Sequence, residues 1–405
     1  LYQMQNRRSR IIWFVAIAIA FLFIVDPFRL FESNTIPQMR VNREIEQQMV
    51  EHLSSAPDAD RFVLDSFDAH DLVLLGETGY VKQQLEFLAD LIPRLDAAGI
   101  RHLGFQYANR SDQDRIDELL TRASFDEDLA EEVLFDHMVI MGYEEHRAVF
   151  RAAWQVNRDK DEGDQPFRII GLSHDIDYTL IEEQDDVEDA DVLRRLFADG
   201  VPDEVMAATV MERIVEPGHR GLVYTKFEHA FTRFVQPQYT QRMSEQGFAN
   251  QKRMGNILAD RLGNRVMTTL FHMPIRDTRS RAGYGYPVGG LMEKAVAKLP
   301  EGPASIGFDV SASPYAEAPV TSDTITEGMD EELTFERFTD GYLVIGPIAS
   351  YEPVTPIAGF ITESNIARAR EEFPGPNPGE VTAAEMNEYI VGTASSLERI
   401  FEEFE

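Results

Sequence analysis

The sequence predicts an α/β protein with a mostly parallel central sheet, helices on both faces of that sheet, and one transmembrane helix before it. Short apolar runs recur along the chain, and stretches long enough for one or two helices separate them. Strands joined in this way need crossover connections, which are typical of parallel pairing. An uncharged run near the N-terminus predicts the membrane helix.

The uncharged run covers residues 11–25, and the apolar residues that follow extend it to residue 31. As a helix its first part would be about 22 Å long, against a hydrocarbon core of roughly 30 Å. Arg7, Arg8 and Arg10 precede it, so the positive-inside rule places residues 1–10 in the cytoplasm. We expect residues 11–31 to be a single-pass signal anchor in the cytoplasmic membrane, with the lipid bilayer as a partner. A cleaved signal peptide and a buried core helix are the alternatives, but no small residues mark a cleavage site near residue 25.

The rest of the chain is expected outside the cytoplasm, in the periplasm or the extracellular space. Residues 32–60 would form a linker and a first helix, and residues 61–405 an α/β domain with a core over 65–275 and an extension over 276–405. Helices are expected over residues 81–98 and 380–405. Strands are expected over residues 71–76, 101–107, 167–172, 222–226, 265–271, 304–308 and 342–345.

Charge and cysteine content limit the function. Seventy acidic residues against thirty-eight basic ones give a formal charge of −32. Such a surface repels phosphate backbones, so we expect no nucleic-acid partner. The chain has no cysteine, which excludes disulfides, thiolate catalysis and cysteine–metal sites.

The candidate site lies where the strands end, because ligands of open parallel sheets bind beyond the carboxyl ends of the strands. Imidazole beside carboxylate supplies either metal ligands or an acid–base pair. The candidates near successive strand ends are Glu77, Tyr80, Gln106, Tyr107, His174, Asp175, Asp177, Lys226, His229 and His272. By contrast, His137 and His146 lie in acidic helical stretches and are expected at the surface.

Several candidates have a purely structural alternative. Glu77 could interact with the N-terminus of the following helix, and His229 or His272 could be a hydrogen-bonded core histidine. The glycine-rich segment 277–290 is expected to be a mobile loop near the site. Its Arg279 and Arg281 could clamp a substrate carboxylate or phosphate, or lie in solvent.

Four motifs carry a resemblance to a known superfamily. They are LVLLGE (72–77), IIGLSHDID (169–177), LVYTKFEHA (222–230) and VMTTLFHMP (266–274). Over residues 65–275 their order and spacing resemble the superfamily of erythromycin esterases, ChaN-like haem-binding lipoproteins and Tiki membrane proteases. The resemblance implies a site of Glu77 and His229 with Asp175 or Asp177 nearby, used for hydrolysis, sometimes with a divalent metal, or for haem binding.

The chain departs from this family pattern at two positions. Esterase-like members carry a histidine two or three residues after the Gly-Glu pair, where this chain has Gly79 and Tyr80. The second strand commonly ends in an acidic residue, where this chain has Gln106. The first change removes the obvious general base, for which His174 is a substitute if it faces inward, and the second weakens a metal site.

Two functions therefore remain open, with a scaffolding role that involves no small ligand as a further alternative. The first is a membrane-tethered hydrolase of an ester or amide bond in a small-molecule or peptide substrate. In it Glu77, His174, Asp175 and His229 are catalytic, and Glu77, His229 and Asp177 hold a divalent metal. The residues expected to contact its substrate are Tyr80, Gln106, Tyr107, Lys226, His272, Arg279 and Arg281. The second is a non-catalytic protein that binds haem or another small ligand on the same scaffold; the acid–imidazole cluster favours the first and the two departures favour the second.

Overall fold

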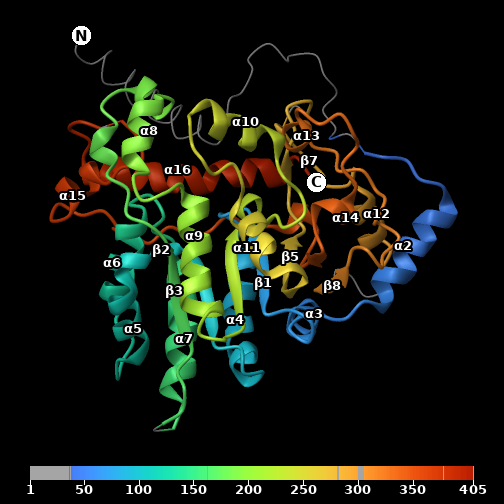
Figure 1. Ribbon diagram of the computed structural model, residues 1–405, viewed down its shortest axis with the longest axis horizontal. Helices are drawn as coiled ribbons and strands as arrows, with labels where there is room; N and C mark the ends of the chain where they lie inside the picture. The colour runs from blue at the N-terminus through green and yellow to red at the C-terminus, as the bar shows by residue number, and fades with distance from the viewer. Residues whose placement is uncertain are drawn as a thin grey trace.

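A seven-stranded sheet forms the centre of the molecule, with the strand order β3-β2-β4-β1-β5-β9-β8 (Figure 1). The computed structural model describes residues 36, 38–161, 163–280, 282–299, 305–376 and 378–404. All strand pairs in this sheet are parallel except the β8–β9 pair at one edge. The predicted fold class is therefore confirmed as a mostly parallel sheet with helices on both faces.

The strands lie where the apolar runs predict them. They are β1 (Leu72–Glu77), β2 (His102–Asn109), β3 (Arg168–Ser173), β4 (Gly221–Lys226), β5 (Val266–Phe271), β8 (Ile306–Asp309) and β9 (Gly341–Val344). A separate two-stranded ribbon pairs β6 (Ile275–Arg276) with β7 (Tyr284–Gly285) inside the glycine-rich segment. All six residues of β1 are buried, as expected for a central strand covered on both faces.

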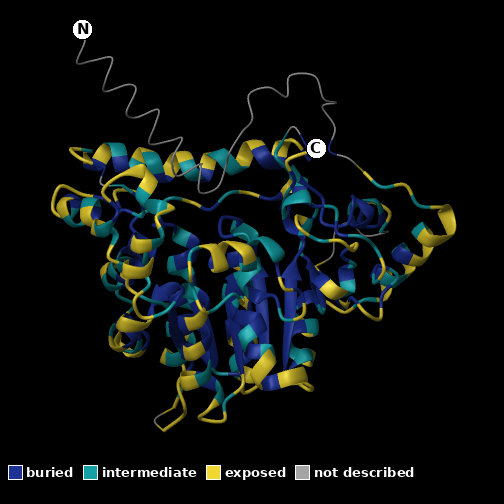
Figure 2. Cartoon of the chain, turned by 45° about the horizontal axis from the view of Figure 1, so that its top comes forward, coloured by how far each residue is buried: buried dark blue, intermediate teal, exposed yellow. Residues whose placement is uncertain are grey.

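Alternate strand residues point into two different cores. In β1, Val73 and Leu75 pack on one face and Leu72 and Leu74 on the other. The first face is covered by α3 (Ala59–Ser66), α4 (Lys82–Ala97), α5 (Gln113–Thr121), α6 (Glu127–His137) and α7 (Glu144–Arg158). The second is covered by α2 (Arg43–Ser55), α9 (Pro202–Val210), α11 (Met254–Leu262) and α12 (Leu291–Val296). Figure 2 shows the strands as the most deeply buried part of the chain.

The C-terminal helix α16 (Ala383–Glu402) runs across the molecule rather than along a sheet face (Figure 1). Thr382 caps it through a hydrogen bond to the amide of Glu385. Its residues Leu397, Ile400 and Phe401 line a cavity together with Glu77, so α16 lies over the carboxyl ends of the strands. The remaining helices are α8 (Ala190–Leu196), α10 (Pro237–Glu245), α13 (Asp323–Thr326), α14 (Phe335–Phe338) and α15 (Ile366–Glu371).

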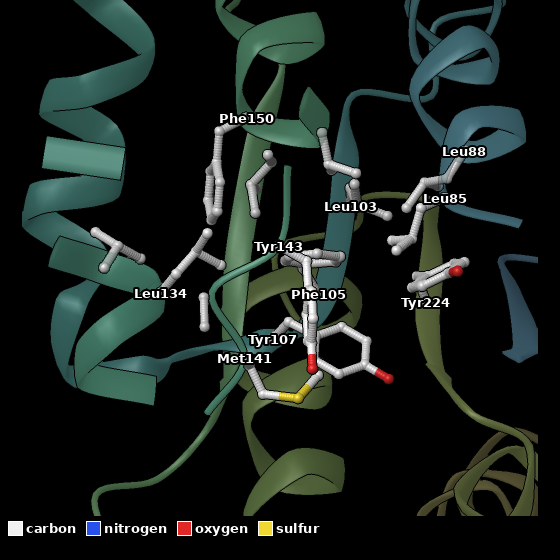
Figure 3. Packing of buried hydrophobic residues seen from close by; sticks show 14 of the residues in the cluster. Leu85, Leu88, Leu103, Phe105, Tyr107, Leu134, Met141, Tyr143, Phe150 and Tyr224 are labelled. Atoms are coloured by element: carbon white, nitrogen blue, oxygen red, sulfur yellow. The ribbon is translucent and has the colours of Figure 1, made fainter. Parts of the chain in front are cut away.

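An aromatic cluster supports the strand ends from beneath. Phe105 and Tyr107 of β2 pack against each other and against Tyr224 of β4, and Tyr143, which directly precedes α7, belongs to the same cluster (Figure 3). Edge-to-face and tilted contacts between such rings add to their large buried area. The cluster fixes the position of the Tyr107 hydroxyl, which reaches the candidate site.

The expected signal anchor, residues 11–31, and the expected cytoplasmic segment, residues 1–10, lie outside the described residues. Among the helices that the structure does describe, none has the length and apolar character needed to cross a bilayer. The predicted first helix is present as α2.

Candidate functional site

Glu77 ends β1 and is the deepest charged group of the site. Its side chain is 1% exposed. Tyr107 Oη donates a hydrogen bond to Glu77 Oε1 over 2.5 Å, and the Gly79 amide donates to Oε2. Gly79 has φ +92°, a left-handed conformation that turns its amide back toward the carboxylate. A side chain here would also lie 3.1 Å from Tyr107 Oη, so the position favours glycine over the histidine of the family pattern.

Burial raises the pKa of Glu77 to about 7, because the charged form loses its hydration. The hydrogen bond from Tyr107 and the positive charge of Lys226 oppose this shift, and the negative charge of Glu228 adds to it. Glu77 is therefore balanced between its acid and base forms near neutral pH, as a proton-transfer group requires.

A cavity of about 860 Å³ opens above Glu77. Its polar lining includes Glu77, Lys226, Glu228 and Arg276. Segment 277–290 contributes Thr278, Ser280 and Tyr284 to the wall, so its expected position beside the site is confirmed. The cavity is large enough for a substrate well above the size of the smallest metabolites.

Lys226 is the cation nearest to Glu77 in the cavity. It ends β4, beside β1, and its Cε lies 3.4 Å from where a side chain on Gly79 would begin. Gln106 fixes the backbone here, since its Oε1 accepts hydrogen bonds from Lys226 N (2.8 Å) and Thr225 Oγ1 (2.6 Å). Among the described residues no carboxylate lies within ion-pair distance of Lys226, so its ammonium group is available to a substrate.

The expectation that His146 lies at the surface is wrong. Its side chain is fully buried, and its ring centroid lies 4.4 Å from that of Tyr107. His137 is half-buried beside the same tyrosine, at 5.9 Å. Burial lowers the pKa of both histidines to about 3, so both are neutral at pH 7. Both ring nitrogens of His146 lack a hydrogen-bond partner among the described residues.

His229 is held by a carboxylate that the sequence did not point to. Its Nδ1 lies 2.6 Å from Oδ1 of Asp203, which is buried at the start of α9. The Met254 amide and the Tyr239 hydroxyl also donate to Asp203. Burial alone would raise the pKa of Asp203, but His229, Arg253 and the Met254 amide together hold this pKa well below its usual range.

The three candidates after β3 lie away from the cavity. Asp175 is exposed and accepts hydrogen bonds from Asn109 and Ser111, and Asp177 is exposed and caps Thr179. His174 is partly buried, with its ring 6.0 Å from that of Phe197. None of the three is among the described residues that line the cavity. The physical reason is the strand order, which puts β3 at the sheet edge, with β2 and β4 between it and β1.

His272 lies in the core behind the site. Its side chain is 1% exposed, with Nδ1 2.9 Å from Tyr342 Oη and Nε2 2.8 Å from Glu293 Oε1. His272 is thus a hydrogen-bonded core histidine, the structural alternative to a site residue.

Arg279 donates hydrogen bonds to Asp277 and to the Thr321 carbonyl and is not among the described lining residues, while Arg281 lies outside the described residues. Tyr80 is buried and lines the cavity.

The residues present do not fit a metal or a histidine-ligated haem in this cavity. Of the expected metal ligands Glu77, His229 and Asp177, only Glu77 is among the described residues that line the cavity. No group of three or more ligating side chains with metal geometry occurs in the described part of the chain. The described cavity lining includes tyrosines but no histidine.

Comparison with known proteins adds fold similarity only. No protein-family model matches the chain, and no curated protein matches it. A structural genomics target from Bacillus cereus superposes with a TM-score of 0.50 at 11% identity, over 78% of this chain and 100% of that one. A protein described as a succinoglycan biosynthesis protein superposes with a TM-score of 0.51 at 10% identity, with the same coverage.

An erythromycin esterase mutant in its open conformation is among the other matches, with a TM-score of 0.45 at 12% identity, over 77% of this chain and 97% of that one. The haem-binding ChaN of Campylobacter jejuni also occurs among them. At these identities the similarities show a shared fold alone, and it is shared with the two structures whose TM-scores are 0.50 and 0.51.

Proposed function

We propose that the chain is a hydrolase of ester or amide bonds in which Glu77 is the general base. One observation carries the proposal: a fully buried carboxyl with a pKa of about 7 lines a cavity large enough for a substrate. A general base works best when its pKa lies near the working pH.

In this mechanism each described group has one task. Glu77 accepts a proton from a water molecule, which attacks the substrate carbonyl, and Glu77 then gives the proton to the leaving group. The ammonium group of Lys226 stabilises the negative charge that develops on the carbonyl oxygen. Tyr107 and Gly79 hold the two carboxylate oxygens in place.

Purified full chain would be tested on 4-nitrophenyl esters and 4-nitroanilides of increasing acyl length. Glu77→Gln should lower kcat/KM by about 10² or more, because proton transfer by a positioned base contributes on that scale. Lys226→Gln should lower kcat by about tenfold or more with a smaller change in KM, since its charge acts mainly on the transition state.

Glu216→Gln is the matched control, because Glu216 is exposed just before β4, at the opposite end of the sheet. It should retain full activity. Turnover by Glu77→Gln at the level of the control, or no turnover of any ester or amide by the unmodified chain, would contradict the proposal.

We further propose that residues 11–31 anchor the chain in the cytoplasmic membrane with the α/β domain outside the cytoplasm. The charge-free run and the three arginines before it support this orientation. In spheroplasts, added protease should digest the domain while the membrane fraction retains the N-terminal segment. Recovery of the intact chain in the soluble fraction would contradict the anchor.

A further inference from the structure

A second cavity, of about 450 Å³, adjoins the one above Glu77. The two share the lining residues Gln236, Gln238, Arg242 and Glu327, so a ligand can extend from one into the other. Most of the shared residues belong to α10 or directly precede it. The second cavity has no role in the proton transfer assigned to Glu77.

A rigid platform supports this second cavity. Asp203 accepts hydrogen bonds from Tyr239 Oη (2.9 Å), from His229 and from the Met254 amide, and Arg253 Nη1 lies 3.4 Å from it. The guanidinium carbon of Arg253 lies 3.7 Å from the centroid of the Tyr239 ring. The buried carboxylate therefore fixes both the aromatic ring and the cation on it.

A second guanidinium group lies beside the same ring. Arg242 Cζ is 5.9 Å from the Tyr239 centroid, and Arg242 lines both cavities. Arg242 is exposed to solvent. No carboxylate among the described residues lies within ion-pair distance of Arg242, and Arg253 Nε is buried without a partner there.

The carboxylates of the second cavity are already hydrogen-bonded to neutral side chains. Gln241 Nε2 donates to Glu245 over 2.7 Å, and Gln238 Nε2 donates to Glu327. Side-chain amides thus supply hydrogen bonds to Glu245 and Glu327, and the N–H groups of Arg242 are available to a ligand. Two guanidinium groups lie beside the Tyr239 ring, and Arg242 has no carboxylate within ion-pair distance among the described residues, so the arrangement favours an added anion.

We propose that Arg242, supported by Arg253 and Tyr239, binds an oxyanion of the substrate, a carboxylate or a phosphate. This rests on the proposed function in one respect: the same molecule would present its scissile bond to Glu77 in the adjoining cavity. In a chain with a formal charge of −32, an anionic substrate is repelled at long range, so a local pair of cations is needed to hold it.

Binding alone tests the subsite, without turnover. Isothermal titration calorimetry on the full chain would compare glutarate and propyl phosphate with glutaramide, which has no charge. We expect at least one anion to bind about tenfold or more tightly than glutaramide, since hydrogen bonds to charged groups contribute on that scale. The preferred anion distinguishes a carboxylate from a phosphate site.

Arg242→Gln should remove this preference. Arg261→Gln should retain it, because Arg261 is an exposed arginine at the end of α11 and lines neither cavity. Glu77→Gln should also still bind the anion, so loss of turnover and loss of binding are separable. Equal binding of glutaramide and both anions, or an undiminished preference in Arg242→Gln, would overturn the subsite even if esters are hydrolysed.

Discussion

At the scale of single residues, Glu77 is defined by what surrounds it rather than by its sequence neighbours. Its two hydrogen-bond donors come from the turn after β1 and from β2, and its nearest cation comes from β4. The donors favour the charged form, but complete burial outweighs them. The result is a carboxyl group that gains or loses its proton near neutral pH.

This perturbed pKa makes stability depend on pH. Between pH 4.5 and about 7 the folded chain keeps the Glu77 proton while the unfolded chain has lost it, so stability falls as pH rises. Glu77→Gln removes this contribution. The difference in free energy of unfolding, Glu77→Gln minus the unmodified chain, should therefore increase by on the order of 3 kcal/mol from pH 4 to pH 8. Urea unfolding at both pH values measures this; a constant difference between the two proteins would count against a raised pKa.

His146 makes stability depend on pH in the opposite direction. Its pKa is lowered to about 3, so below pH 6.5 the unfolded chain binds a proton that the folded chain does not, and stability falls as pH falls. In His146→Phe this loss between pH 7 and pH 5 should be smaller by ~2 kcal/mol. Urea unfolding at the two pH values tests this, and an unchanged loss in the variant would show that His146 ionises normally.

The sequence predicted one part of the site and missed another for a physical reason. The rule for parallel strand ends points to Glu77 and Lys226, which line the cavity, whereas Gln106 and Tyr107, expected to contact substrate, are not among its described lining residues. His146 does not follow from this rule, because a helical residue faces the core or the solvent according to tertiary packing. The signal was present: His146, Val149, Phe150 and Ala153 share one helical face, and all four are buried. Asp203 follows a helix-starting proline and resembles an ordinary first-turn acid.

At the scale of the elements, all seven strands of the main sheet could be predicted, because each is an apolar run between helical stretches. The strand order could not, since crossover length does not tell which neighbour a strand joins. That order places β3 at the edge and takes His174, Asp175 and Asp177 away from Glu77. A position just after a parallel strand therefore did not by itself place a residue near Glu77.

Two helical glycines differ in how closely other backbone approaches them. A side chain on Gly255 in α11 would meet the carbonyl oxygens of Ala230 and Phe231 at 2.5 Å, whereas Gly392 in α16 has open space around it. Gly255→Ala should therefore destabilise the fold by about 2 kcal/mol or more. Gly392→Ala should stabilise it by about 0.5–1 kcal/mol, as helix propensity predicts.

Denaturant unfolding of both glycine variants at pH 7 provides the measurement. Each serves as the control for the other, because the chemical change is the same. A stabilised Gly255→Ala protein would mean that α11 does not pack against the turn carrying His229 in the way described.

At the scale of the whole molecule, acidic surface surrounds a site whose cavity wall carries cations. Lys226, Arg242 and Arg276 line the cavity above Glu77, against the carboxyl groups of Glu77, Glu228 and Glu327. The lining is thus close to balanced, whereas the chain has a formal charge of −32. Helix α16, from the far end of the sequence, contributes Leu397, Ile400 and Phe401 to the cavity lining.

The excess negative charge should also lower the stability of the fold through self-repulsion. Raising NaCl from 10 mM to 500 mM screens this repulsion, so Tm should rise by roughly 1–3 °C, as a stabilisation of about 1 kcal/mol would produce. Differential scanning calorimetry gives the value. A lower Tm at high salt would mean that the surface ion pairs stabilise the fold more than the net charge destabilises it.

The most direct test of the central claim is a titration of the Glu77 carboxyl itself. Glutamate labelled with ¹³C at the side-chain carboxyl would be followed by NMR against pH, with Glu77→Gln identifying the signal by its disappearance. A midpoint near pH 7 would establish Glu77 as a group able to transfer protons at neutral pH. A midpoint below about pH 5, close to that of an ordinary glutamate, would contradict the assignment of Glu77 as the general base.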